Sequence, residues 1–183
     1  MKNKILKIGW YFILSRKLYI YIILIFILQI PLLANNKQLI LTKDSKHFVL
    51  GKYLEILEDP QNRYGIQDVS SQDFAKKFIK STSHIPSFGF TDSFIWIKFT
   101  INTKDIYEND WILEFGDPLT DKVDFYFPDD RHKYNKISRG YSQPFSQRRN
   151  HYYNLIFNLN LISNTSQTFY LNLKSSDSLE IPV

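Results

Sequence analysis

The sequence predicts an all-β fold, an antiparallel β-sandwich with one short helix, and three observations lead to that fold class. Hydrophobic and polar residues alternate over most of the chain after residue 90, which is the pattern of strands with one buried face. Turn-forming residues such as Asp117-Pro118 and Asp129-Asp130 separate the alternating runs. Aromatic residues make up 16% of the chain, which favours strands over helices. About seven or eight strands at this spacing indicate two facing sheets.

The first 34 residues form a segment of their own. Five Lys or Arg residues and no acidic residue precede the apolar run of residues 18–30, and Ala34 stands at its polar end. This order is typical of a secretory signal peptide. The run is short for a membrane span, which needs roughly 20 apolar residues, and the alternative is an uncleaved anchor. Either reading predicts that residues 35–183 are exported from the cytoplasm.

The composition of the remaining chain excludes several function classes. The five cations of the leader account for the whole net charge of +5, so the exported part has no basic excess for binding nucleic acid. The absence of cysteine excludes disulfides, thiolate zinc sites and a cysteine nucleophile. A hydrophobic fraction of 44% in 183 residues indicates one folded domain rather than a disordered chain.

The first half of the exported part is expected to contain the helix. Residues 35–47 are polar and predict a tether, which leaves residues 48–183 as the β-sandwich domain. Residues 51–59 predict a first strand that ends before Pro60. A helix of about ten residues is expected after Ser70 and Ser71, with Phe74, Phe78 and Ile79 on its buried side. Residues 83–89 are expected to form a loop.

The second half predicts strands. In residues 94–101, one face carries Ile95, Ile97, Phe99 and Ile101, and the opposite face carries Phe94, Trp96, Lys98 and Thr100. The same alternation is present in residues 111–115, 122–127, 153–161, 168–174 and 179–183. These inward-facing sets predict the core of the sandwich.

Catalytic motifs are missing from the sequence. None of the four histidines has a His, Asp or Glu partner at a ligand spacing. Asp129 and Asp130 follow Pro128 and are expected to form a turn. We therefore expect no enzyme activity, no metal and no cofactor.

Candidate ligand-binding residues lie on the polar face of the predicted sheet. Trp96 could stack on a sugar ring, with Lys98, Asn154, Asn158 and Tyr170 as polar neighbours if their strands lie beside it. The alternative is that Trp96 belongs to the core, since large aromatic side chains are usually well buried.

Two loops add further candidates. Arg148 and Arg149 precede a predicted strand, and guanidinium groups bind carboxylates or phosphates in a two-point geometry. They could contact an anionic ligand or a partner domain, or they could be solvated. Ser176, in a serine-rich stretch with Ser175 and Ser178, forms either a ligand rim or an ordinary turn.

Three stretches together carry a family resemblance. They are GKYLEILED at residues 51–59, FGFTDSFIWIKF at residues 88–99 and FYLNLKSSDSL at residues 169–179. Residues 111–116 and the Arg148 loop follow in the expected order between them. This ordered set resembles the second type of extracellular domain in bacterial seven-transmembrane receptors with diverse intracellular signalling modules. The resemblance extends from about residue 49 to residue 183.

The resemblance implies a jelly-roll-like sandwich, similar to carbohydrate-binding modules, in the periplasm. In that family the domain precedes a seven-helix membrane domain and a cytoplasmic output module, and sugars are the suspected ligands. The sequence ends at Val183, so the chain is expected to be a receptor fragment or a truncated form. The alternatives are a free exported carbohydrate-binding module and a protein-docking scaffold.

Overall fold

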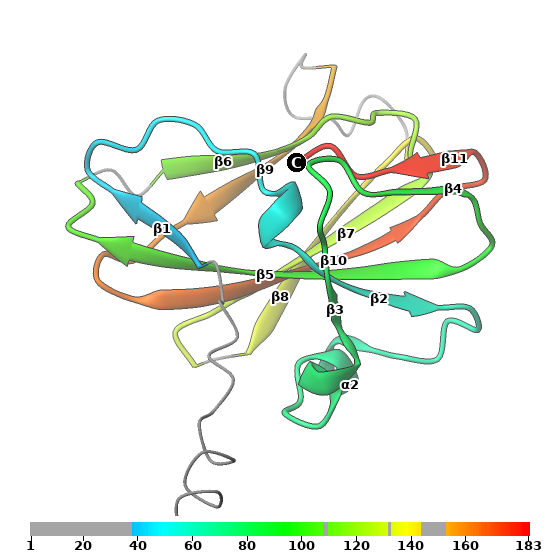
Figure 1. The fold of residues 1–183 in the computed structure, drawn as a ribbon, viewed down its shortest axis with the longest axis horizontal. Helices are drawn as coiled ribbons and strands as arrows, with labels where there is room; N and C mark the ends of the chain where they lie inside the picture. Colours follow the sequence, from blue (N-terminus) through cyan, green and yellow to red (C-terminus); the bar gives the residue numbers. More distant parts are fainter. Residues whose placement is uncertain (1–37, 108–109, 132, 144–152) are drawn as a thin grey trace, which may run out of the picture. The chain divides into compact units, whose positions relative to one another are not determined.

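The computed structural model describes residues 38–107, 110–131, 133–143 and 153–183, which belong to one compact unit, Gln38–Val183. The predicted leader and the Arg148 loop lie outside the described residues. The elements are β1 (Leu39–Thr42), η1 (Gly51–Tyr53), β2 (Glu55–Asp59), α2 (Ile66–Val69), η2 (Phe74–Lys77), β3 (Ile79–Lys80), β4 (Ser87–Phe90), β5 (Phe94–Lys104), β6 (Asp110–Phe115), β7 (Lys122–Pro128), β8 (Tyr134–Arg139), β9 (Leu155–Asn160), β10 (Ser166–Lys174) and β11 (Ser178–Glu180) (Figure 1). The all-β fold class is thereby confirmed.

The larger layer is a seven-stranded sheet in the order β3-β2-β5-β10-β7-β8, with β1 pairing onto β5. Its pairs are antiparallel except for β1 and β5, which run parallel. β5 is the longest strand, and its inward set of Ile95, Ile97, Phe99 and Ile101 is almost fully buried. Alternation along β5 therefore predicted the core side chains of the central strand correctly.

The smaller layer consists of two two-stranded sheets, β4-β11 and β6-β9. They lie on one side of the larger sheet, above β5 and β10 in Figure 1. The main core fills the space between the layers and contains side chains from both. Phe125 of β7 and Phe157 of β9 make a direct contact across it, with ring centroids 5.1 Å apart. Burial of each such ring contributes roughly 1.5–3 kcal/mol, so these contacts hold the two layers together.

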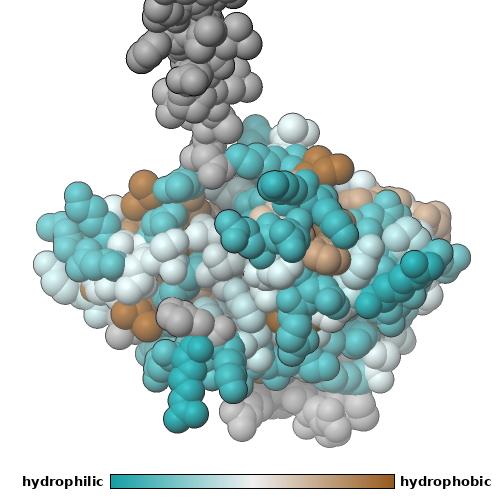
Figure 2. Space-filling model, turned by 90° about the horizontal axis from the view of Figure 1, so that it is seen from below, coloured by the Kyte–Doolittle hydropathy of each residue, from teal (hydrophilic) through white to brown (hydrophobic). Residues whose placement is uncertain are grey.

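The opposite face of the larger sheet, here called the outer face, carries a second, smaller hydrophobic cluster. Residues 60–78, here called the cover segment, lie over part of it and include α2 and η2 (Figure 1). Val69 and Phe78 of the cover segment pack with Trp96 and Tyr170 of the sheet. Seen from below, most of this side of the domain is hydrophilic, and its hydrophobic residues form small separate patches (Figure 2).

The predicted helix was wrong in position and length. The chain forms one helical turn at α2 and a 3-10 turn at η2, and it is extended at β3. Phe74 packs edge-on against Tyr64, at 4.8 Å between ring centroids, while Phe78 approaches Tyr170 at 6.2 Å. The helical path ends at η2, and the extended backbone after it places Ile79 opposite Ile56 of β2.

Four short segments also differ from the sequence-based expectations. The polar tether contains β1, whose Leu39 and Leu41 are 2% exposed. The predicted first strand begins with the 3-10 turn η1, so its strand is limited to β2. The predicted loop at residues 83–89 contributes β4, which pairs with β11. β8 was not predicted, because its sequence YNKISR lacks an apolar alternation.

Candidate functional site

Three of the predicted site residues lie together on the outer face. Lys98 of β5 is the direct register partner of Tyr170 on β10, and Trp96 lies two residues away on β5. The side chains of Trp96 and Tyr170 are 2% and 4% exposed, respectively. Trp96 contacts Tyr126 with ring centroids 5.4 Å apart. Trp96 is therefore a buried member of the outer cluster, and its ring offers no open stacking platform.

Lys98 has a carboxylate partner on the neighbouring strand. Its Nζ donates to Glu55 Oε2 at 3.1 Å, and it also lies 5.6 Å from the centroid of the Phe78 ring. Both side chains of the ion pair are mostly shielded, with 17% and 26% exposure. Lys98 thus links β5 to β2 and to the cover segment.

Asp124 is the centre of the polar part of the outer face. Its carboxylate is 2% exposed and accepts a hydrogen bond from Ser138 Oγ at 2.7 Å. Lys122 and Lys136 reach the same carboxylate at 3.0 and 3.3 Å. Burial, together with the charge of Asp124 and a hydrogen bond to it, raises the pKa of Tyr126 to about 12. The buried carboxylate is thereby paired with cations and hydrogen-bonded, as burial of a charge requires.

Of the other predicted site residues, the two that the structure describes, Asn154 and Ser176, lie away from the outer face. Asn154 donates its side-chain amide to Glu114, next to the smaller sheet. Ser176 lies in the β10–β11 turn, where its backbone N–H donates to Asp121 Oδ2 at 2.6 Å. Arg148 and Arg149 lie outside the described residues. The described members of the predicted set therefore lie in three separate places, namely the outer face, the smaller sheet and the β10–β11 turn.

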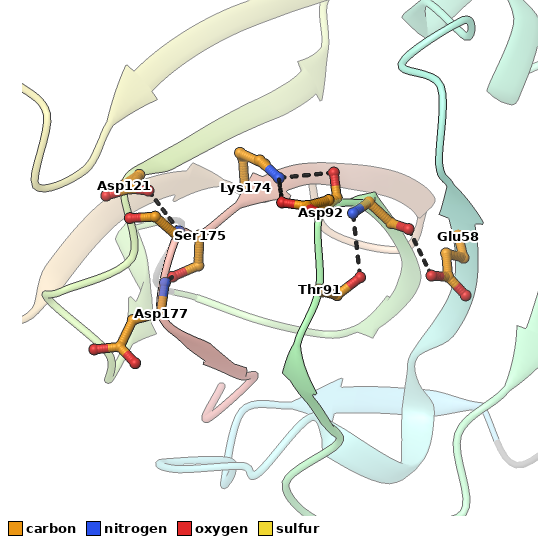
Figure 3. A network of polar contacts seen from close by, with 9 residues as sticks. Glu58, Thr91, Asp92, Asp121, Lys174, Ser175 and Asp177 are labelled. Atoms are coloured by element: carbon orange, nitrogen blue, oxygen red, sulfur yellow. Dashed lines mark hydrogen bonds and ion pairs between the residues drawn. The ribbon is translucent and has the colours of Figure 1, made fainter.

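The β10–β11 turn takes part in a polar network at one end of the larger sheet (Figure 3). Lys174 Nζ donates to the backbone oxygen of Asp92 at 2.7 Å, which ties β10 to the turn before β5. On the β2 side, Ser93 Oγ donates to Glu58 Oε1 at 2.6 Å. All three stretches that carried the resemblance, residues 51–59, 88–99 and 169–179, thus meet here. Their contacts join strands to each other, which indicates a structural role.

An open groove of 620 Å³ lies where the ends of β7 and β8 approach β9, the segment after β9 and the first residues of β10. Its lining combines aromatic rings, amides, hydroxyl groups and carboxylates, from Phe127, Asp129, Asp130, Tyr134, Asn135, Asn158, Asn160, Thr165, Ser166 and Thr168, among others. None of its described lining residues is a lysine or an arginine. Concave sites with apolar walls and a few polar groups are the usual places for small ligands.

The carboxylate of Asp129 serves the β7–β8 turn. Its Oδ1 accepts backbone N–H groups of Arg131 and Lys133 at 2.9 and 2.8 Å. The predicted turn at Asp129 and Asp130 is confirmed. The exposed lining residues whose polar groups a ligand can reach include three amides, Asn135, Asn158 and Asn160, together with Asp130 and Ser166.

The groove is connected to the outer face through one side chain. Tyr134 lines the groove, and its ring packs edge-on against Tyr170, with centroids 5.2 Å apart and planes at 85°. Burial raises the pKa of both phenols, and a hydrogen bond between them lowers the pKa of Tyr134 in part. Tyr134 and Asn135 were missed because β8 was not predicted, whereas Asn158 was named among the candidate neighbours.

The described ranges contain no cluster of three or more His, Asp or Glu side chains placed to hold a metal ion. Within the same part of the chain, no helix has the length and apolar character needed to cross a membrane.

The fold and the groove define a β-sandwich domain with a small-molecule-sized site. Comparison with protein families gives a match to the 7TMR-DISM extracellular 2 domain over residues 51–183. The chain therefore belongs to this family of receptor extracellular domains, as its resemblance had implied. The search of curated proteins gave no match.

Proposed function

We propose that the chain is the periplasmic ligand-sensing domain of a seven-transmembrane signalling receptor, without catalytic activity. Support comes from its family, whose members are extracellular domains of such receptors. The export leader predicted for residues 1–34 agrees with a periplasmic location. Sensing requires a ligand that binds one receptor conformation more tightly than the other, because only differential affinity shifts the equilibrium between them.

The ligand in this proposal is an uncharged polar molecule such as a carbohydrate, bound in the groove. The observation that carries the proposal is the lining, which offers exposed amides beside the rings of Phe127 and Tyr134. A sugar hydroxyl both donates and accepts hydrogen bonds, and a side-chain amide offers both a donor and an acceptor. The apolar C–H face of a sugar ring can pack on an aromatic ring. The absence of Lys and Arg from the described lining disfavours an anionic ligand.

The predicted residues on the outer face have an indirect role in this proposal. Tyr170 supports the groove residue Tyr134 from behind, and Trp96 and Lys98 hold the strand beside Tyr170. Arg148, Arg149, Asn154 and Ser176 stay candidates for contacts outside the groove.

Titration of the purified full chain with a panel of mono- and oligosaccharides tests the ligand class by calorimetry. We expect saturable binding of at least one sugar, and about a tenfold or greater loss of affinity in Asn135→Ala/Asn158→Ala, because each lost hydrogen bond contributes about 0.5–1.5 kcal/mol. The matched control is Gln72→Ala, which removes an exposed amide outside the groove. Binding that is unchanged in the double variant would exclude the groove, and no binding of any sugar would exclude the ligand class.

The receptor assignment has a separate test. The genomic sequence downstream of this reading frame should encode seven apolar spans of about 20 residues each. A downstream sequence without such spans would contradict the receptor reading for this gene, whatever the groove binds.

A further inference from the structure

Two buried hydrogen-bond donors on the outer face have no partner in the described structure. They are the indole Nε1 of Trp96 and the amide Nδ2 of Asn172. The two residues are 2% and 4% exposed and are direct register partners on β5 and β10. Side chains that lie opposite each other on one face of a sheet have Cβ atoms about 4.5–5.5 Å apart. The two donors therefore belong to one place in the molecule.

A buried donor without a partner is rare in a folded protein, because it has lost its hydrogen bond to water and gained none. Trp96 carries a donor only, so a second donor such as the Asn172 amide nitrogen cannot satisfy it. Both atoms need an acceptor.

The carboxylate of Asp124 is not that acceptor, because neither donor has a partner among the described residues. Asp124 is the register partner of Asn172 on β7, and it already binds Ser138, Lys122 and Lys136. These three donors occupy most of the about four acceptor positions of a carboxylate.

The charge of the missing acceptor follows from its neighbours. Lys122 and Lys136 are paired with Asp124, and Lys98 is paired with Glu55. These three described lysines already have carboxylate partners, so a buried anion beside Asp124 would meet a like charge that none of them is left to offset. An uncharged oxygen atom can accept hydrogen bonds from the two N–H groups without repulsion from the Asp124 carboxylate.

We propose that an uncharged oxygen from outside the polypeptide occupies the outer face between Trp96 and Asn172, and accepts a hydrogen bond from each. This oxygen belongs either to an enclosed water molecule or to a hydroxyl or carbonyl group of a small polar ligand held beneath the cover segment. Val69 and Phe78 of the cover segment, 1% and 8% exposed, close the cluster that contains Trp96. The site is independent of the groove, so it stands whether or not the groove binds a sugar.

A high-resolution crystal structure of the full chain tests the proposal directly. We expect electron density within about 3.2 Å of both Trp96 Nε1 and Asn172 Nδ2. A single-atom peak identifies a water molecule, and larger density, matched to a small molecule by mass spectrometry of the protein, identifies a ligand. Either result supports the proposal, and empty space between the two donors overturns it.

A stability measurement provides a second test, because its sign differs between an occupied and an empty site. Asn172→Leu keeps the branching and the number of side-chain heavy atoms and removes the amide donor. With an oxygen in place, the variant loses that hydrogen bond, and the unfolding midpoint should fall by about 2–4 °C. In an empty site, the variant removes an unpaired polar group, so a midpoint above that of the wild type would overturn the proposal.

Discussion

The carboxylate of Asp59 accepts the backbone N–H of Tyr64 at 3.0 Å, and this contact turns the chain from β2 onto the outer face. The same carboxylate accepts the N–H of Arg63 at 3.1 Å and is almost fully buried. Tyr64 then contacts Phe74, which belongs to the cover segment. One side chain at the end of a strand therefore determines where the cover segment begins.

Replacement of Asp59 should destabilise the domain through this turn. Asp59→Ala leaves two backbone donors without their acceptor, and we expect the free energy of unfolding to fall by about 2–3 kcal/mol. Urea denaturation followed by tryptophan fluorescence measures the change. The control is Asp44→Ala, at an exposed position in the turn after β1. Equal stability of the two variants would show that the Asp59 contacts do not hold the turn.

Gly51 should tolerate no side chain. A Cβ atom at this position would overlap the backbone carbonyl of His84, which is main chain and cannot move aside easily. We expect Gly51→Ala to cost about 1–3 kcal/mol by overpacking. Gly65→Ala is the matched control, because its Cβ would meet only side-chain atoms at 3.5 Å or more. Thermal unfolding of both variants checks the difference, and a Gly51→Ala midpoint equal to that of the control would contradict it.

The stability of the domain should decrease at alkaline pH. In the unfolded chain Tyr126 titrates near its ordinary pKa of 10.0, while in the folded domain, burial first and Asp124 second raise its pKa to about 12. The folded state therefore binds more protons between these values. The stabilisation is fully present below pH 10 and is lost as the pH rises toward 12.

Spectrophotometric titration of the phenolates checks this shift. Tyr126→Phe should remove one of the late-titrating phenols, and the control is Tyr107→Phe, at a position 82% exposed. If Tyr126→Phe instead removes a phenol that titrates near the ordinary pKa of 10.0, burial and the Asp124 contact do not raise the pKa of Tyr126.

The wall of the groove should depend on Thr103, which does not line it. Its Oγ1 donates to the carbonyl oxygen of Ile162 at 2.6 Å and accepts the N–H of Thr165 at 3.0 Å. Ile162 and Thr165 are groove residues. Thr103→Val keeps the shape and removes both bonds, so we expect a stability loss of about 1–3 kcal/mol and weaker ligand binding.

Differential scanning calorimetry and ligand titration measure the two effects. Thr42→Val is the control, since its hydroxyl makes only a long contact of 3.4 Å with Ser45. A Thr103→Val variant with wild-type stability and affinity would show that the wall does not need this anchor.

The main core was predictable from the sequence because each core strand has one buried face. Alternation placed Leu113 and Phe115, Val123 and Phe125, and Phe169, Leu171 and Leu173 in the core, and all of them are buried. The alternation states which side chains share a face, which is enough to define two packed layers.

Alternation could not decide what covers the outer face. The alternation places Trp96 on the polar side of β5. The cover segment, which comes earlier in the chain, buries this side chain. The spacing of Phe74 and Phe78 predicted that both rings lie on one side of a single helix. In the structure the two rings contact different partners, Tyr64 and Tyr170, and spacing alone carries no information about such contacts. Long-range packing thus overrode the local preference.

The groove was mostly hidden for a related reason. Tyr134 and Asn135 lie on β8, an edge strand of polar sequence, and no periodic signal marks it. The alternation indicated that Asn158 is on the polar face of its strand. Its position beside β7 and β8 depends on how the two sheets pack against each other. A single sequence does not contain that information in a local pattern.

The most direct measurement of the central claim is a nuclear magnetic resonance titration of the full chain, labelled with nitrogen-15, against the sugar that binds in the calorimetric panel. We expect the side-chain amide signals of Asn135, Asn158 and Asn160 to shift together with a single affinity. Shifts confined to amides away from the groove, such as those of Gln61 and Gln72, would contradict the account.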